Sequence, residues 1–322
     1  MKVKRLLLAA LAATSMIAVT ACDGDVVQIG ILKFINIAPL NSAQEGFVSA
    51  LDEAGINYKL SLKDANADGN LVSSSALTLI GESDLVLGIA TPAASGLLSA
   101  RAIKGNDVPI LFTAVTDPVF SGLMTDANAP DNNISGTSDM NPVREQIELF
   151  TKLGLNIDKI GMIYCSTETN SVIQKDLAAA AATEFDLDFV FETFTTTDQV
   201  AAAMDTLIEA GIDGLYTPTD STLVSAYSTV KAKADAANLP IIAGEEACLD
   251  LGAVATLSIN YFDLGRITGE MAVEFLNGKA MSELPVRHVE DMPLILHVDN
   301  AAGIGLTFPA DLLEEADEVI DN

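Results

Sequence analysis

The chain has 322 residues and a formal net charge of −28 at pH 7, from 45 acidic against 17 basic residues. A surface this acidic repels nucleic acid and has no polybasic attraction to anionic lipid, so no polyanion is expected as a partner. The length is enough for two domains of ordinary size.

The first residues resemble a targeting segment. A basic start is followed by an apolar run from Leu6 to Val19, which is shorter than the roughly 20 residues of a spanning helix. Cys22 directly follows the small residue Ala21, as in the lipobox of bacterial lipoproteins. We therefore expect a lipoprotein signal peptide over residues 1–21, lipidation at Cys22 and a tether over 22–27. The alternative is an ordinary secretory peptide with a chance cysteine at its end.

From Val26 on, short β-branched runs alternate with longer Ala-rich stretches of helical period, which is typical of parallel βαβ units. In the first half this pattern predicts strands at Val27–Phe34, Tyr58–Leu62, Asp84–Ala90 and Val108–Phe112. The helices expected between them are Ala43–Ala54, Leu71–Ile80 and Ala93–Ile103.

The same order of elements starts again at Lys159. Strands are predicted at Ile160–Tyr164, Asp188–Thr193, Asp213–Pro218 and Leu239–Ala243. The helices expected between them are Ser171–Phe185, Thr197–Ala210 and one that ends at Ala237. In both halves an Asp opens a buried strand that ends in Thr-Pro, and a helix, a Pro-Ile strand and an acidic loop follow.

Elements remain after both halves are complete: a helix over Phe262–Asn277, a strand over Leu294–Val298 and a helix over Ala310–Ile320. They indicate that the chain crosses back between the halves, and several crossovers form a hinge. The expected fold is α/β, with two doubly wound, Rossmann-like lobes and a ligand cleft between them. We assign 28–138 and 260–290 to the N-terminal lobe, and 139–259 and 291–322 to the C-terminal lobe.

Ligands of open α/β sheets bind at the carboxyl ends of the strands, so the loops there hold the candidate site. In the first half, Thr91 caps a helix whose free amides, at Ala93 and Ala94, suit a carboxylate. The hydroxyl of Thr91 caps its own helix, binds the ligand, or does both. The candidates after the next strand are Thr113, Thr116 and Asp117. The hydroxyls add donors, while Asp117 either faces an ammonium group or stabilises its own turn.

The second half supplies negatively charged side chains, in contrast to the amide and hydroxyl donors of the first half. Glu168, Asn170 and Ser171 lie at a helix start, and Asp220 and Glu245 follow the ends of strands. A carboxylate inside a closing cleft needs a positive partner. Few Lys or Arg residues lie nearby in the sequence, so a ligand ammonium group is expected at Asp220 and Glu245. A solvated loop charge is the alternative for both.

No catalytic or metal-binding constellation is visible, and neither a cofactor nor a metal is expected. The only histidines, His288 and His297, lie beside no nucleophile or ligand cluster. Cys165 and Cys248 follow strands that we place apart in one sheet, so free thiols are favoured over a disulfide.

Several motifs, taken in order, resemble the substrate-binding lipoproteins of ABC transporters that include the tryptophan- and tyrosine-type importers. They are Ile89–Ala94, Phe112–Pro118, Ile134–Asp139, Glu168–Ser171, Tyr216–Asp220 and Tyr261–Gly265, and the similarity covers almost all of residues 27–320. It implies a type I periplasmic-binding-protein fold with three crossovers and an amino acid, often aromatic, in the cleft. It also implies a permease and its ATPase as partners.

One departure concerns the loop after the first strand. Members of the family usually carry His-Pro-Ala-Leu-Asp there, whereas this chain has Ile37-Ala38-Pro39-Leu40-Asn41. The lost histidine and charge leave the class of the ligand's side chain open.

These features predict a monomeric binding protein, exported and lipid-anchored at the outer face of the cytoplasmic membrane. It would capture a small zwitterion, an amino acid of possibly aromatic type, by hinge closure and deliver it to a permease. A ligand-sensing receptor domain with the same fold stays open as an alternative, and an exported two-lobed enzyme is a third.

Overall fold

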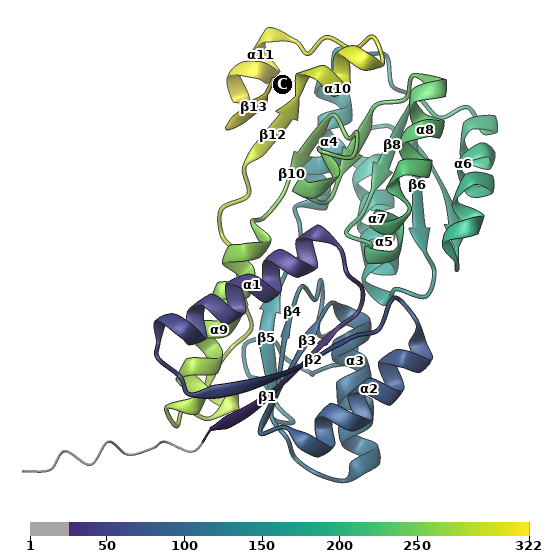
Figure 1. Cartoon of the computed structure of the whole chain (residues 1–322). Coiled ribbons are helices and arrows are strands. Elements are labelled where there is room, and N and C mark those ends of the chain that lie inside the picture. Colours follow the sequence, from purple (N-terminus) through teal and green to yellow (C-terminus); the bar gives the residue numbers. More distant parts are fainter. Residues whose placement is uncertain (1–25, 322) are drawn as a thin grey trace, which may run out of the picture.

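The computed structural model describes residues 26–321, which form two α/β lobes, each built on one sheet (Figure 1). The N-terminal lobe contains, in spatial order, β11 (Arg287–His288), β5 (Ile134–Ser138), β4 (Ile110–Thr113), β3 (Leu85–Ile89), β1 (Val27–Lys33) and β2 (Tyr58–Asp64). The C-terminal lobe contains β13 (Glu318–Ile320), β12 (Leu294–His297), β10 (Ala255–Leu257), β9 (Ile241–Ala243), β8 (Gly214–Thr217), β6 (Lys159–Cys165) and β7 (Asp188–Phe194). The predicted pair of doubly wound lobes is confirmed.

Helices cover these sheets. Those of the N-terminal lobe are α1 (Ala38–Glu53), α2 (Gly69–Glu82), α3 (Thr91–Lys104), α9 (Tyr261–Leu276) and the 3-10 turn η3 (Met281–Glu283). Those of the C-terminal lobe are α4 (Val143–Lys152), α5 (Thr169–Glu184), η1 (Thr197–Gln199), α6 (Val200–Glu209), α7 (Ser221–Ser225), α8 (Tyr227–Ala237), η2 (Glu246–Cys248), α10 (Val298–Gly303) and α11 (Ala310–Glu315).

Burial follows the position of each strand in its sheet. All residues of the central strand β3 are buried, because helices cover both faces of a parallel sheet. The outermost strands β2 and β7 keep exposed residues along their length. All pairings within the described residues are parallel except that of β10 with β12, which is antiparallel because the chain returns to the sheet from the other lobe.

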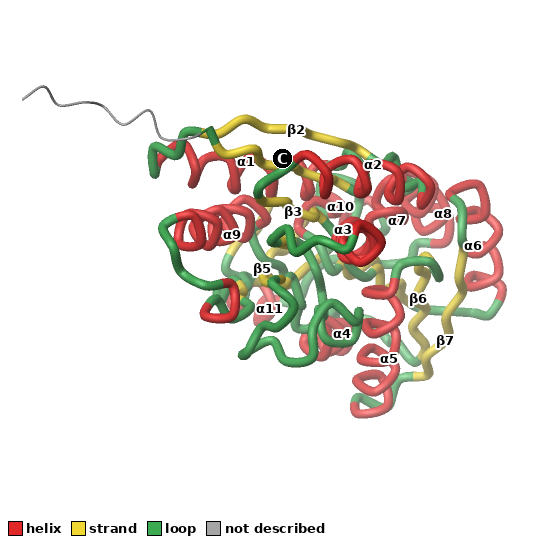
Figure 2. The backbone as a smooth tube through the Cα atoms, turned by 90° about the horizontal axis from the view of Figure 1, so that it is seen from below, coloured by secondary structure: helices red, strands yellow, loops and turns green. Residues whose placement is uncertain are grey.

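The chain passes between the lobes three times within residues 26–321, at 139–142, 258–260 and 289–293. After the second passage, α9 returns to the N-terminal lobe and lies beside α1, as Figure 2 shows from below. The two backbones touch: a Cβ atom on Gly46 would overlap the carbonyl oxygen of Phe262, and one on Gly265 would overlap that of Ala43. Only glycine permits so close an approach, so this contact fixes α9, and the segment before it, to the N-terminal lobe.

Several elements differ from the sequence-based expectations. Helix α1 begins at Ala38 rather than Ala43, since Pro39 suits a first helical turn. The expected closing helix is wrong beyond Glu315, because β13 pairs with β12 there. The helix expected to end at Ala237 is split at Ala226 into α7 and α8. The elements that were not predicted are α4, β5, η2, β10, η3, β11, α10 and β13.

The expected signal peptide and the lipidation site Cys22 lie outside the described residues. Within residues 26–321, no helix combines the length and the apolar character that crossing a membrane requires.

Candidate ligand site between the lobes

Loops at the carboxyl ends of strands from both sheets meet between the lobes. The hydroxyl oxygens of Thr116, after β4, and Thr219, after β8, are 3.4 Å apart and buried. Asn141, in the first connection between the lobes, donates its side-chain N–H to the carbonyl of Gly244, after β9. Thus the predicted site loops of the two lobes touch one another directly.

Thr91 begins α3, but it is not the N-cap residue. Ala90 holds that place with a φ of 78°, a conformation that costs energy for a residue with a side chain. The expectation that Thr91 caps its helix is therefore wrong. The residue is 3% exposed, and its buried hydroxyl has no hydrogen-bond partner among the described residues, so it is available to a bound molecule.

The amides of Ala93 and Ala94 are engaged already. Both donate to the carbonyl of Ala90 at 3.1 Å, and both side chains are buried. A Cβ atom on Gly88 would lie 2.7 Å from the Cα atom of Ala94, so this turn packs closely on β3. That these two amides bind a carboxylate stays a prediction. The geometry shows that the turn they belong to packs closely on β3.

Thr113, at the end of β4, and Thr116 and Asp117, which follow it, have different hydrogen-bond partners. Thr113 accepts a hydrogen bond from the hydroxyl of Thr137 and is fully buried. Thr116 faces the C-terminal lobe through Thr219. Asp117 accepts from the amides of Val119 and Phe120 at 2.9 Å, which is the turn-stabilising geometry that was one of its two expected roles.

Asp220 and Glu168 form a buried acid pair inside the C-terminal lobe. Asp220 caps α7 through the amide of Leu223 and also accepts from the amide of Cys165 at 2.6 Å and the hydroxyl of Ser171 at 2.8 Å. Glu168 accepts from both donors of Thr222. Burial, together with the charge of Asp220, raises the pKa of Glu168 well above its usual value, so its neutral form is favoured. The pair joins β6, α5 and α7.

Asn170 also belongs to this lobe's framework, since its side-chain N–H donates to the carbonyl of Thr219 at 2.7 Å. Its side-chain oxygen, in contrast, has no partner among the described residues. Glu245 lies at the start of η2, 3% exposed, and its Oε2 atom likewise has no partner there. Burial and the charges of Asp139 and Asp220 raise the pKa of Glu245 to about 8.

Two residues of the first connection were not predicted as site residues. Asp139 and Asn141 are each 4% exposed, and each keeps one side-chain oxygen without a partner in the described part of the chain. The other carboxylate oxygen of Asp139 accepts from the hydroxyl of Tyr261 at 2.9 Å. Asp139 ends the motif Ile134–Asp139 and Tyr261 begins another, so the motif order is a signal that could have identified these two residues.

Thr91, Asp139, Asn141, Asn170 and Glu245 are therefore buried polar residues with unused hydrogen-bonding capacity; we call them the inter-lobe cluster. The unused side-chain oxygens of Asn141 and Asn170 are acceptors, and those of Asp139 and Glu245 are acceptors when the carboxyl group is ionised. None of the ion pairs in residues 26–321 involves a carboxylate of this cluster. Buried acceptors without partners are costly, so the cluster suits a molecule that brings hydrogen-bond donors and a positive charge.

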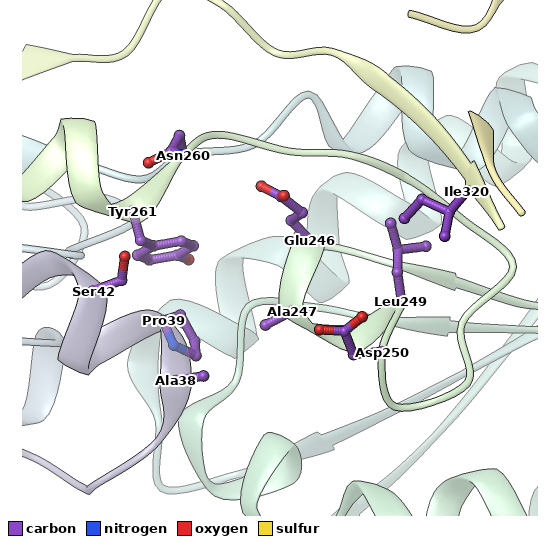
Figure 3. A pocket seen from close by; sticks show the side chains of 10 residues that line it. All are labelled: Ala38, Pro39, Ser42, Glu246, Ala247, Leu249, Asp250, Asn260, Tyr261 and Ile320. Carbon is purple, nitrogen blue, oxygen red and sulfur yellow. The ribbon is translucent and has the colours of Figure 1, made fainter. Parts of the chain in front are cut away.

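A cavity of about 260 Å³, shown in Figure 3, is lined by Glu246, which follows the cluster residue Glu245 in the chain. Its walls come from the start of α1, from η2 and from the start of α9. They include Ala38 and Pro39 of the loop that departs from the family pattern, and the exposed carboxylates of Glu246 and Asp250. Tyr261 lines the cavity and donates a hydrogen bond to Asp139, so this residue connects the cavity to the cluster.

Cys165 and Cys248 are both buried and free, as the strand order predicted. Cys165 is the last residue of β6 and Cys248 lies beyond β9, and β8 separates these strands in the sheet.

Comparison with known proteins agrees with the fold. The family model of ABC transporter substrate-binding proteins matches residues 28–320. The chain therefore belongs to this family: it is a solute-binding protein of the ABC transporter type and not an enzyme.

Relatives of known identity cover most of the chain. A tyrosine-binding protein from Clostridioides difficile is 34% identical over 283 residues, which are 86% of this chain and 81% of the relative. The crystal structure of an ABC domain from Streptococcus pneumoniae in complex with L-Trp is 31% identical, with a TM-score of 0.87, and covers 92% of this chain and 100% of that one. The ligand-free, open structure of a substrate-binding protein with adhesive properties from Clostridium difficile is 33% identical over the same shares, with a TM-score of 0.68.

Proposed function

We propose that this chain captures a zwitterionic amino acid, of the tryptophan or tyrosine type, between its lobes for an ABC importer. The observation that carries the proposal is the inter-lobe cluster, whose buried acceptors have no partner within the described residues. A relative that binds tyrosine and a similar structure that holds L-Trp support the choice of an amino acid.

The two ends of such a ligand differ in charge, and so do the two sides of the cluster. Thr91 offers a hydroxyl donor to the ligand carboxylate, and Thr116, whose hydroxyl contacts that of Thr219, lies in the same lobe. Glu245 and Asp139 offer carboxylate oxygens to the ammonium group. Asp220, Glu168 and Ser171 support this wall from behind, because their hydrogen bonds are made within the C-terminal lobe.

We further propose that ligand capture closes the two lobes. The comparison structures support this step: the chain fits the L-Trp complex with a TM-score of 0.87 and the ligand-free, open structure with only 0.68, although both are similarly identical in sequence. We attribute this difference in TM-score to a difference in lobe orientation. The three connections at 139–142, 258–260 and 289–293 then act as the hinge.

The remaining parts of the proposal concern location and partners. The segment 1–21 directs export, lipid on Cys22 holds the monomeric protein at the outer face of the cytoplasmic membrane, and the closed form delivers its ligand to a permease driven by an ATPase. Lobe boundaries of 28–138 with 260–290, and 139–259 with 291–322, accompany this proposal, and the membership of the two sheets supports them.

Thermal unfolding of the purified protein against all twenty amino acids, short peptides, purines and sugars tests the proposal. A ligand at about 100 times its Kd adds about 2.7 kcal/mol, which raises the midpoint by about 5 °C for a chain of this size. We expect this shift with L-tryptophan or L-tyrosine. A shift with a sugar or purine and with no amino acid would contradict the proposed ligand class.

A further inference from the structure

Ile37 occupies a position in α1 that its side chain does not suit. It is the N-cap residue of the helix, with extended backbone, and its side chain makes no cap hydrogen bond. Polar residues are strongly preferred at an N-cap because their side chains accept from the first free amides of the helix, and isoleucine has no atom that does so. An isoleucine at this position therefore points to contacts that the side chain makes outside its own helix.

The side chain of Ile37 packs against the hydrophobic cores of both lobes. In its own lobe it lies against the core that includes Phe34 and Leu40. In the C-terminal lobe it lies against the core that includes Leu223 and Leu249. Within residues 26–321, no other apolar side chain packs against hydrophobic clusters of both lobes. Ile37 is thus an apolar contact between the lobes, in addition to the polar contacts of the candidate site.

The space around Ile37 is also bounded by both lobes. A cavity of about 410 Å³ beside it is lined by Asn36, Ile37, Ala38 and Pro39 of the N-terminal lobe and by Val224, Ser225, Ala247, Asp250 and Leu251 of the C-terminal lobe. Figure 3 shows part of this boundary, with the start of α1 on one side and η2 on the other. None of these lining residues belongs to the inter-lobe cluster, so Ile37 lies outside the proposed ligand site.

We propose that Ile37 is an apolar latch, which stabilises the closed orientation of the lobes without touching the ligand and thereby sets the affinity for any ligand bound between them. The inference rests on the proposed closure of the lobes. The two cores belong to lobes that the chain joins through the connections at 139–142, 258–260 and 289–293. When the lobes separate, Ile37 keeps its contact with the N-terminal lobe and loses its contact with the C-terminal lobe.

The size of the effect follows from burial. Fully burying an isoleucine side chain favours the buried state by about 10- to 150-fold. Ile37 is only half-buried, and part of its contact is with its own lobe, so loss of the side chain should lower the ratio of closed to open protein by about tenfold. A protein that is mostly open without ligand passes this whole factor on to its affinity, whereas a mostly closed one opens instead.

Calorimetry with L-tryptophan and L-tyrosine, together with small-angle X-ray scattering of the ligand-free protein, tests the latch in Ile37→Ser. We expect the affinity for both amino acids to fall by one common factor of about ten, or the radius of gyration of the ligand-free protein to rise. The thermal midpoint of the ligand-free protein should stay within about 2 °C of the parent value, because serine caps α1 through the amide of Leu40 and so offsets the lost apolar contact.

Two further variants separate the latch from a general loss of apolar surface. Ile37→Val keeps a β-branched apolar side chain and should stay within about threefold of the parent affinity. Ile103→Ser makes the same change as Ile37→Ser on α3, at a side chain that is 73% exposed, and should bind as the parent does.

The results that would overturn the latch are distinct from those that concern the ligand. Factors that differ between the two amino acids would show that Ile37 touches the ligand side chain, and parent affinity with parent radius in Ile37→Ser would show that it is no latch. If neither amino acid binds the parent protein, the proposed ligand class fails. The radius of the ligand-free protein then decides alone, since expansion in Ile37→Ser supports the latch and an unchanged radius overturns it.

Discussion

Replacing Asp220 with alanine separates a structural role from a ligand-binding role. In the structure its carboxylate accepts from the amide of Leu223, the amide of Cys165 and the hydroxyl of Ser171, and the residue is fully buried. Each buried donor that loses its partner costs about 1–3 kcal/mol. Because the three donors relax together, we expect the free energy of unfolding to fall by about 3–6 kcal/mol in total.

Urea denaturation of the ligand-free protein, followed by circular dichroism, measures this change. The matched control is Asp68→Ala, since Asp68 also caps a helix, α2, with its side chain, but on the exposed surface. There we expect a loss of about 1 kcal/mol. If Asp220→Ala unfolds as the parent protein does and only loses affinity for amino acids, Asp220 is a ligand contact and our account of the acid pair is wrong.

Three further outcomes follow from the packing and the buried groups. Gly46→Ala should lower the thermal midpoint by several degrees, because its Cβ atom would overlap Phe262. The control Gly303→Ala, whose Cβ atom would meet nothing within 4 Å, should leave the midpoint unchanged. Equal midpoints for the two variants would refute the close α1–α9 contact. Cys165 and Cys248 should react with a thiol reagent only after denaturation, since burial raises the pKa of both thiols; fast labelling of the folded protein would contradict their placement. Glu184→Gln removes an exposed ion pair with Arg144 and should change the free energy of unfolding by less than about 1 kcal/mol. A larger loss of stability, measured by urea denaturation, would show that this pair stabilises the fold more than its exposure suggests.

The architecture was predictable because it is determined by the hydrophobic periodicity of the sequence and by the order of the strands. Buried runs such as Leu85–Ile89 and Ile160–Tyr164 are recognisable by composition alone, and the repeated order of elements indicated two lobes. The short strands β10, β11 and β13 have two or three residues each, which is too few for any period to show. Helix α4 (Val143–Lys152) has an amphipathic pattern, but it lies between the two matching halves, so the repeated order of elements did not predict it.

The site was predictable in its loops but not in the roles of single residues. Chain position placed Asp220 and Glu245 alike at strand ends, yet one is saturated with hydrogen bonds inside its lobe and the other keeps a free oxygen. That difference depends on neighbours distant in sequence, such as Cys165 and Ser171. Asp139 and Asn141 acquire their importance only from the folded connection between the lobes, which brings them to Tyr261 and Gly244.

A crystal structure of the protein grown with L-tryptophan or L-tyrosine tests the central claim most directly. We predict closed lobes around one amino acid, with its ammonium group within hydrogen-bond distance of Glu245 and Asp139 and its carboxylate at Thr91. A ligand bound in the cavity between Pro39 and Asp250, or one oriented with its carboxylate towards Glu245, would contradict the account.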